Sequence, residues 1–334
     1  MDPIGTGVIG VGRMGALFAR LLTQLPQANL LGVADVDSER AQAVAAATGT
    51  TPFTDYQELL ALEGLEAVVI TTPDQLHHAP AMAALDAGKH ILMEKPLTMD
   101  VAEGEEIVAA AREAGLCLMV AHCLRFDPRY IQAHNAVREG AIGEVVTCYA
   151  RRNIYFDEGR KIAQRTSLPF YLGVHDIDIL HWITGNRVVK VRAYGSRRLM
   201  EDLGMDDAVQ SLLEFHDGSI GCVEQAWVFP RNSGPRQSPV LEIVGTAGFI
   251  HVNPYQVGVS IHQAGEASYP DSTYMFDPLV HGRVVGVYEA EAVHFLECVT
   301  TGQEPVITPR EALEAVRVAA AIERSLAEDA DVTP

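Results

Sequence analysis

The stretch "VIGVGRMG" (Val8–Gly15) joins a short apolar run to the start of a helical pattern. It contains three glycines at the spacing Gly10-x-Gly12-x-x-Gly15. In such a turn one glycine allows the tight bend, the second lets a pyrophosphate approach the backbone, and the third lets the helix pack on the strand. The helix N-terminus then offers N–H groups to phosphate oxygens. Alone, the spacing also fits an ordinary strand–turn–helix unit, so its surroundings must decide.

The residues around this turn alternate between short apolar runs and helical patterns. The runs typical of strands are Ile4–Gly10, Asn29–Asp35, Glu66–Thr72, His90–Met93 and Leu116–His122. Short β-rich runs separated by helices of about 10–14 residues are typical of a doubly wound parallel sheet. The pattern therefore predicts an α/β fold, with a Rossmann domain over residues 1–122.

An acidic residue closes the second predicted strand, where a dinucleotide would place a ribose. Asp35 lies 20 residues after Gly15, and its carboxylate can accept hydrogen bonds from a ribose diol. Asp35 and Asp37 would repel a 2′-phosphate, which favours NAD(H) over NADP(H), although Arg40 could turn toward such a phosphate. We expect the cofactor to lie against the residues of the turn and this carboxylate, namely Gly10, Gly12, Arg13, Met14, Gly15 and Asp35.

Length and composition bound the class of protein. The 334 residues exceed the size at which one hydrophobic core usually keeps growing, so two domains are expected. Hydrophobic residues make up 48% and charged residues 21%, as in an ordinary globular protein. Lys+Arg 25 against Asp+Glu 44 gives 25 − 44 = −19. So acidic a surface repels nucleic-acid backbones and anionic membranes, which makes both unlikely partners.

The cysteines and the N-terminus indicate a compartment. Five scattered cysteines without a C-x-x-C pair favour reduced thiols over disulfides or a zinc site. The opening "MDPIGTGVIG" lacks the segments of a secretion signal, and no apolar run nears the roughly 18 residues of a membrane span. The histidines show no metal-ligand spacing. We therefore expect a soluble, cytoplasmic protein that holds no metal.

A lysine stands where one predicted strand should reach the carboxyl edge of the sheet, in "HILMEKPLTMD" (His90–Asp100). Ligands of open parallel sheets bind at that edge. Pro96 restricts Lys95 to an extended backbone and cannot itself donate a backbone hydrogen bond. Lys95 therefore stands at the mouth of the nucleotide site, or it is a surface lysine near a helix that Asp100 caps.

With these segments the sequence resembles the glucose–fructose oxidoreductase / inositol dehydrogenase / rhizopine-catabolism (Gfo/Idh/MocA) family. The matching segments, in family order, are "VIGVGRMG", "ADVD", "TTPDQLH" (Thr71–His77), "EKPL" (Glu94–Leu97) and "GVHDIDILHWITG" (Gly173–Gly185). The resemblance implies a nicotinamide-dependent oxidoreductase that acts on hydroxyl carbons of sugars and cyclitols.

The resemblance also implies roles for single residues. Lys95 of the E-K-P segment would lie beside nicotinamide and substrate, and His175 of the H-x-x-D segment would be the general base. These roles suit the chemistry, because a base with a near-neutral pKa can remove the hydroxyl proton while an ammonium stabilises the developing alkoxide. Family members line the cofactor with residues that correspond to Thr72, Pro73, His77 and Glu94.

The sequence departs from the family four residues before His175. Many members carry an aspartate there, whereas this chain has Tyr171. Tyr171 could donate a hydrogen bond to the substrate or to His175, but it lacks a carboxylate's charge. Asp178, three residues after His175, could replace the aspartate or form a structural salt bridge. We retain Lys95, His175, Tyr171 and Asp178 as candidate catalytic residues.

After residue 122 the pattern changes. β-rich stretches predominate between Glu144 and His262, with "HDGS" and "GTAG" as turns. This predicts an α+β domain over residues 123–334 with a large, open, mainly antiparallel sheet, and leaves open whether the last helix packs back on the first domain. One face of the sheet could cover the active site and the other could contact a sister subunit. The resemblance implies a homodimer or homotetramer.

Cations in this second domain are candidates for holding the ligands. Arg125 follows the last strand of the first domain and is expected near the cofactor. Strand alternation places Arg152 on one face of its strand, and Arg165 lies in the polar stretch Phe156–Phe170, interpreted as an irregular substrate loop or a solvated one. We expect a small polyhydroxylated substrate to contact Lys95, Arg152, Arg165 and His175.

Three functions fit these features. The first is an NAD-dependent dehydrogenase of a sugar, sugar derivative or cyclitol. The others are a glycoside hydrolase that retains NAD and a non-catalytic NAD-sensing regulator on the same fold. The presence of both Lys95 and His175 counts against the regulator, and the lack of an export signal counts against the hydrolase.

Overall fold

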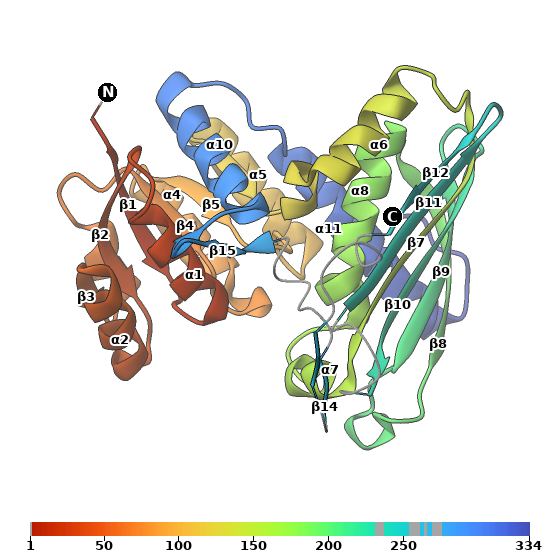
Figure 1. The fold of residues 1–334 in the computed structure, drawn as a ribbon, viewed down its shortest axis with the longest axis horizontal. Coiled ribbons are helices and arrows are strands. Elements are labelled where there is room, and N and C mark those ends of the chain that lie inside the picture. Colours follow the sequence, from red (N-terminus) through yellow and green to blue (C-terminus); the bar gives the residue numbers. More distant parts are fainter. Residues whose placement is uncertain (1, 231–236, 254–260, 264–265, 269–275) are drawn as a thin grey trace. The chain divides into compact units, whose positions relative to one another are not determined.

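The structure is a computed structural model that describes residues 2–230, 237–253, 261–263, 266–268 and 276–334 (Figure 1). The chain divides into two compact units. Unit 1 comprises Met1–Cys123 and Phe276–Leu313, and unit 2 comprises Leu124–Met275 and Glu314–Pro334.

Unit 1 contains a six-stranded sheet with the order β3-β2-β1-β4-β5-β6. The strands are β1 (Ile4–Ile9), β2 (Ala28–Ala34), β3 (Thr51–Phe53), β4 (Ala67–Ile70), β5 (His90–Met93) and β6 (Leu118–Val120). All neighbouring pairs are parallel. The strand order reverses beside β1, with β2 on one side and β4 on the other, so the predicted doubly wound sheet is confirmed.

Helices connect these strands, and their ends follow from local chemistry. They are α1 (Arg13–Leu22), α2 (Ser38–Thr48), α3 (Tyr56–Leu60), α4 (His78–Asp86), α5 (Val101–Ala114) and the 3-10 turn η1 (Asp74–Leu76). Asp100 caps α5 by accepting hydrogen bonds from the N–H groups of Ala102 and Glu103. Gly115 ends the same helix with a φ of 66°, a left-handed conformation that glycine adopts without strain.

A segment from the C-terminal part of the chain belongs to unit 1. The strands β15 (Leu279–Val280) and β16 (Arg283–Val284) form a hairpin, and α10 (Val287–Thr301) follows. Arg20 of α1 donates to Gly282 O (2.8 Å), and the Val284 N–H donates to Gln24 Oε1 (2.9 Å). Figure 1 shows this blue segment beside the red and orange elements of unit 1.

Unit 2 contains a six-stranded sheet with the order β12-β11-β7-β10-β9-β8. The strands are β7 (Val145–Tyr155), β8 (Val188–Ser196), β9 (Ala208–Phe215), β10 (Ile220–Phe229), β11 (Gln237–Gly245) and β12 (Phe249–Val252). Neighbours are antiparallel except β7 and β10, which pair in parallel. The predicted, mainly antiparallel sheet is confirmed, and its parallel pair reflects the long connection from β7 to β10.

A further predicted strand, Gln256–His262, lies mostly outside the described residues. Within the described part, β13 (Ile261–Gln263) and β14 (Glu266–Ser268) pair with each other as a separate two-stranded sheet.

Helices cover one face of the unit 2 sheet (Figure 1). The elements are η2 (Cys123–Phe126), α6 (Pro128–Arg138), α7 (Phe156–Ile162), the π-helical turn η3 (Pro169–Gly173), α8 (Val174–Thr184), η4 (Glu201–Leu203) and α11 (Pro309–Glu328), whose residues from Glu314 on belong to this unit. α8 packs on both α6 and β7. Every second residue of β7, from Cys148 to Ile154, is buried, while most of the residues between them are only partly buried. The opposite face of the sheet therefore remains open.

Candidate active site

The carboxyl edge of the unit 1 sheet brings together residues that are far apart in sequence. The parallel ladder continues past the strand ends through 2.8 Å bonds from Gly10 N–H to Ala34 O, Thr71 N–H to Ile9 O, and Glu94 N–H to Ile70 O. The glycine-rich turn, the T-T-P segment and the E-K-P segment therefore lie in a row along one edge. Ligands of open parallel sheets bind at this edge.

The glycine-rich turn leaves an opening at the N-terminus of α1. Gly10 has a φ of +86°, and a Cβ there would lie 2.8 Å from Thr72 N. A Cβ at Gly15 would lie 2.0 Å from Gly10 O, whereas one at Gly12 would meet nothing within 4 Å. No side chain caps α1, which begins with Arg13. Uncapped helix N–H groups facing open space suit a phosphate, so the residues present fit a dinucleotide pyrophosphate.

Asp35, which is predicted to bind the ribose, also accepts hydrogen bonds from the backbone around the turn. Its Oδ2 accepts a hydrogen bond from Val11 N–H (2.8 Å), and its Oδ1 accepts one from Asp37 N–H (2.9 Å). Arg40 Nη1 lies 3.4 Å from both Asp35 oxygens, and Arg40 Nη2 lies 3.1 Å from Asp37 Oδ2. The arginine that could have favoured a 2′-phosphate is thus engaged by the two carboxylates that disfavour one.

Asp35→Ser is expected to lower kcat/KM for NAD⁺ by about 10- to 100-fold, because a hydrogen bond to a charged group contributes about 1.5–3 kcal/mol. Relative use of NADP⁺ should rise, since one repelling carboxylate is gone and Arg40 is released. Steady-state kinetics with both cofactors measure the change. Asp37→Ser is the matched control for NAD⁺ use: it also removes a repelling carboxylate, but serine can still cap α2 and the proposed ribose acceptor remains, so kcat/KM for NAD⁺ should stay near that of the wild type. An unchanged NAD⁺/NADP⁺ preference in Asp35→Ser would contradict this role.

His77 joins the loops that follow β4 and β5. Its buried ring places Nδ1 2.8 Å from Pro96 O and Nε2 3.0 Å from Thr72 O. Burial lowers the pKa of His77, and this effect outweighs the opposing influence of Asp74 and the backbone carbonyls. The neutral ring can donate to only one carbonyl at a time. His77 was predicted as a cofactor contact, and both of its nitrogens are directed at the protein backbone.

Lys95 lies two residues after Met93, the last residue of β5, and its peptide bond to Pro96 is cis. The Lys95 N–H donates to Glu94 Oε2 (3.0 Å). Burial raises the pKa of Glu94, and the positive charge of Lys95 opposes that shift. The Glu94 side chain therefore anchors the backbone from which the lysine projects.

A second buried carboxyl, which the sequence patterns did not indicate, interacts with Glu94. Glu291 of α10 is fully buried, and neither of its oxygens has a hydrogen-bond partner among the described residues. Burial raises the pKa of Glu291 well above its ordinary value, and the charge of Glu94 adds to the shift. Tyr288, one turn earlier, interacts with both carboxyls and packs edge-on against Phe18 with ring centroids 6.0 Å apart. An i, i+3 pair of polar residues on one helix face was the available signal.

Glu291→Gln is expected to raise the thermal stability of the protein increasingly as the pH rises above about 4.5. Its raised pKa lets Glu291 hold its proton to a higher pH in the folded state than in the unfolded chain, where it ionises above about that pH. The folded state thus binds more protons, so the wild type loses stability as the pH increases, and a neutral glutamine does not. Melting temperatures from pH 4 to 8 measure this. Glu289→Gln, on the same helix but paired with Arg283 (3.8 Å), is the control. A pH-independent difference would contradict the assignment.

In unit 2, His175 lies in the first turn of α8, directly after the π-helical turn η3 that carries Tyr171. Both side chains are partly exposed, whereas Val174 and Asp176 are buried. A spacing of four residues places His175 and Tyr171 on the same side of a helix. This side of the helix start is therefore partly exposed, although the Nδ1 atom of His175 is buried.

Two arginines predicted to bind ligands contact aspartates of α8. Arg152 donates to Asp176 from Nε (3.2 Å) and Nη2 (2.8 Å). Arg125 donates to Asp178 from Nε (3.0 Å) and Nη2 (2.6 Å). All four side chains are at most 5% exposed. Asp178 therefore forms a salt bridge, the second of the alternatives that its spacing allowed.

The polar stretch interpreted as an irregular loop is partly helical. Residues Phe156–Ile162 form α7, with Asp157 and Glu158 in its first turn and Arg160 and Lys161 in its last turn. Charges of these signs at these ends stabilise a helix, a signal that the loop interpretation missed. Arg165 follows the helix, is exposed, and forms no ion pair with any residue that the structure describes.

No group of three or more His, Cys, Asp or Glu side chains among the described residues is placed to hold a metal ion. None of the helices in that part of the chain is long and apolar enough to span a membrane.

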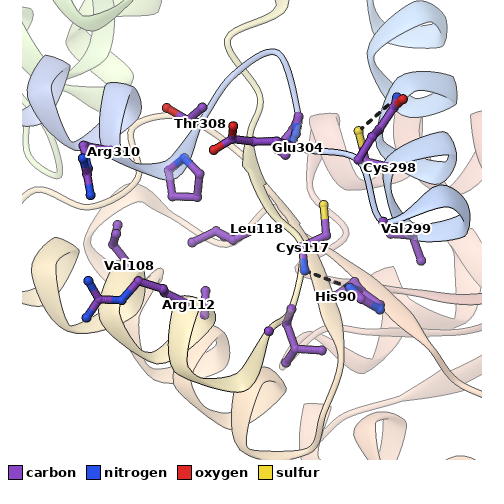
Figure 2. Close-up of a pocket in the computed structure, with 17 residues that line it drawn as sticks. His90, Val108, Arg112, Cys117, Leu118, Cys298, Val299, Glu304, Thr308 and Arg310 are labelled. Atoms are coloured by element: carbon purple, nitrogen blue, oxygen red, sulfur yellow. Dashed lines mark hydrogen bonds between the residues drawn. The ribbon is translucent and has the colours of Figure 1, made fainter.

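A cavity of about 620 Å³ lies at the other edge of the unit 1 sheet, where β5 and β6 begin (Figure 2). Its lining includes His90, Cys117, Arg112 of α5 and Cys298 of α10. The Cys117 N–H donates to His90 Nδ1 (2.9 Å), which ties together the starts of the two strands. Because it opens at the amino ends of the strands, this cavity is not the dinucleotide site.

Comparison with known proteins gives matches along most of the chain. Residues 4–122 match "Oxidoreductase family, NAD-binding Rossmann fold", and residues 130–251 match "GFO/IDH/MocA C-terminal domain". The scyllo-inositol 2-dehydrogenase (NAD(+)) of Bacillus subtilis (strain 168) is 30% identical over 311 residues, which cover 90% of this chain and 87% of the relative. The inositol 2-dehydrogenase of Rubrobacter xylanophilus is 32% identical over 258 residues, covering 76% and 72%.

A solved structure shares the fold. The scyllo-inositol dehydrogenase from Lactobacillus casei, crystallised with bound NAD(H) and scyllo-inositol, superposes with a TM-score of 0.87 at 21% identity. The match covers 99% of each chain.

Proposed function

Because the chain belongs to the Gfo/Idh/MocA family and is an NAD-dependent oxidoreductase acting on CH–OH groups, we propose that it oxidises a ring hydroxyl of an inositol or a closely related cyclic polyol. The observation that supports this substrate class best is the 30% identity to a scyllo-inositol 2-dehydrogenase across 90% of the chain. Lys95 and His175, the two groups that such a reaction needs, are both present.

NAD⁺, when bound, supplies the hydride acceptor. In our proposal the α1 N-terminus holds the pyrophosphate, and Asp35 accepts hydrogen bonds from the ribose. Lys95, whose backbone is anchored by Glu94, donates a hydrogen bond to the substrate hydroxyl oxygen. Its positive charge stabilises the negative charge that develops there as the proton leaves.

His175 accepts the proton of that hydroxyl. Tyr171, on the same side of the helix start, donates to a neighbouring substrate hydroxyl and takes the place of the family's aspartate in binding. We do not assign Asp178 as a base, because Arg125 binds its carboxylate from two nitrogens. Arg165, exposed at the end of the polar stretch, stays a candidate substrate contact.

The substrate proposal is tested by absorbance at 340 nm with NAD⁺ and a panel of scyllo-inositol, myo-inositol, glucose and xylose. We expect NADH to form with an inositol isomer at least tenfold faster than with the aldoses. Product without net NADH would indicate the NAD-retaining hydrolase, and tight NAD binding without any product would indicate the sensor.

We also propose that the chain forms a homo-oligomer through the open face of the unit 2 sheet. One row across that face comprises Phe249, Val244, Thr147, Ile220 and Glu214, in register on neighbouring strands. Its apolar members Phe249, Ile220 and Val244 are 74%, 57% and 44% exposed. Exposed apolar groups in a contiguous row favour association with a second copy.

Ile220→Glu is expected to shift the protein to a smaller oligomer, because it replaces an exposed apolar side chain of this row by a negative charge beside Glu214. Light scattering after size exclusion measures the mass. Leu199→Glu, an equally exposed position (51%) outside the sheet strands, should leave the mass unchanged. A wild-type protein that is monomeric at micromolar concentration would contradict the interface.

A further inference from the structure

Two aspartates, Asp176 and Asp178, follow His175 on α8, and each is bound by an arginine from a different element. Asp176 accepts two hydrogen bonds from Arg152 of β7 (3.2 and 2.8 Å). Asp178 accepts two from Arg125 of η2 (3.0 and 2.6 Å). The side chains of the first pair are 3% and 5% exposed, and those of the second are 1% exposed. In the segment "HDID" one partly exposed histidine is thus followed by two aspartates that form buried ion pairs.

The positions of the two aspartates around the helix axis have a common structural consequence. Successive residues of an α-helix are separated by about 100° around its axis. Asp176 therefore points about 100° to one side of His175, and Asp178, three residues on, points about 60° to the other side. A rotation of α8 in either direction would pull one carboxylate away from its guanidinium. The two pairs together fix the direction in which His175 projects.

No side-chain cap fixes the start of α8. It continues the π-helical turn η3 through Gly173, which has a helical φ of −61°, and the Val174 N–H donates to Pro169 O of that turn. Backbone bonds along the axis hold the helix together but do not fix its rotation about that axis. Breaking a buried pair is costly because an uncompensated charge remains. Planar, two-point contacts also fix direction better than a single ammonium contact would.

Further contacts hold the two arginines. Tyr130 of α6, which is buried, shares a hydrogen bond with Arg152. The Arg125 guanidinium lies 5.6 Å from the ring centroid of Trp182 on α8, and that ring stacks on His134 of α6 at 4.1 Å. Each arginine is thus part of the packed layer of helices and strand beneath His175. Neither is a mobile side chain reaching into solvent.

We propose that Arg152–Asp176 and Arg125–Asp178 are positioning residues that aim His175 at the hydroxyl to be oxidised. The inference rests on the proposed role of His175 as base. It gives Arg152, Arg125 and Asp178 a different role from the substrate, cofactor and catalytic roles predicted from the sequence. The pairs act through the imidazole and not by contact with either ligand.

A double-mutant cycle on the holoenzyme with NAD⁺ and the best inositol substrate tests this. Arg152→Lys keeps the buried cation but loses the two-point contact, and Asp176→Asn keeps the shape but loses the charge. Each single change should lower kcat at least about tenfold, as misplacement of a reacting group does. The double variant should lose no more than the worse single variant, since both changes break one contact. If Arg152 instead binds substrate, Arg152→Lys should mainly raise KM and Asp176→Asn should add a separate effect, which would overturn the proposal.

A pH profile separates positioning from general loss of stability. The acid-side fall of kcat/KM should move by about half a pH unit or more in Arg152→Lys, because the surroundings of the base have changed. Ser325→Ala is the stability control: Ser325 is buried on α11 and bonds Ala193 N–H (2.9 Å) and Ala330 O (2.6 Å). Its loss should lower the melting temperature without moving the profile. A profile unmoved in Arg152→Lys would contradict positioning.

Two further measurements keep the inference distinct from the proposed function. If Arg152→Lys fails to fold, the same cycle is run with Arg125→Lys and Asp178→Asn, which should be equally non-additive. In a His175→Asn background, Arg152→Lys should cause no further loss of kcat. If His175→Asn retains full turnover, the proposed base is wrong and the pairs have no residue to aim. If His175→Asn is inactive while both cycles leave kcat unchanged, only the positioning inference fails.

Discussion

Replacing Lys95 by alanine is expected to lower kcat by about 10²-fold or more while NAD⁺ affinity stays within a few-fold. The reason is the different contacts that binding and chemistry use. In our proposal cofactor binding depends on the α1 N-terminus and Asp35, which the substitution leaves intact. The developing alkoxide, by contrast, would lose the one charge proposed to stabilise it. Stopped-flow measurement of NADH formation gives kcat, and quenching of protein fluorescence gives the NAD⁺ dissociation constant.

Lys89→Ala is the matched control for this experiment. Lys89 lies in the same unit just before β5, and its Nζ donates to Leu65 O (2.9 Å). The control removes a lysine and one hydrogen bond at the amino end of the strand that carries Lys95 at its other end. Its turnover should stay near that of the wild type. Turnover that survives in Lys95→Ala would remove the lysine from the mechanism.

Replacing His175 by asparagine is expected to lower kcat by about 10²- to 10⁴-fold, the contribution typical of a positioned general base. Asparagine has a similar shape near the backbone and can still form hydrogen bonds, but it cannot accept and hold a proton. The remaining activity should also lose its fall toward acid pH, because that fall reports protonation of the imidazole. Rates of NADH formation from pH 5.5 to 9 measure both effects.

His216→Asn is the control for the second experiment, since His216 is an exposed residue in the turn between β9 and β10. It should change neither kcat nor the pH profile. A His175→Asn variant that is slow but keeps the wild-type pH dependence would show that another group accepts the proton. Tyr171 would then be the next residue to substitute, since it shares the same side of the helix start.

Much of unit 1 could be predicted from the sequence because its signals are local. "VIGVGRMG" gave the turn and the helix start, and short apolar runs gave β1, β2, β4, β5 and β6. Of the six strands in the parallel sheet, only the short strand β3, with exposed and partly exposed residues, was missed. The start of α11 also has a local signal in the sequence: Thr308 Oγ1 and Glu311 form a reciprocal capping box there.

Other features could not be predicted from the sequence because they depend on contacts between residues far apart along the chain. Arg152 and Arg125 were interpreted as ligand contacts since a cation in a candidate site has no visible partner in the sequence. Their partners, Asp176 and Asp178, are 24 and 53 residues away along the chain. The burial of Glu291 could not be predicted from its i, i+3 spacing to Tyr288, because it depends on how α10 returns to unit 1.

The sequence by itself determined the doubly wound sheet, the dinucleotide turn and the preference for NAD, because periodicity, glycine conformation and like-charge repulsion act over a few neighbouring residues. Only the tertiary structure decided which charged side chains form ion pairs inside the protein. A buried arginine or carboxylate is stable only beside its partner, and that partner is chosen by packing in three dimensions, not by distance along the chain.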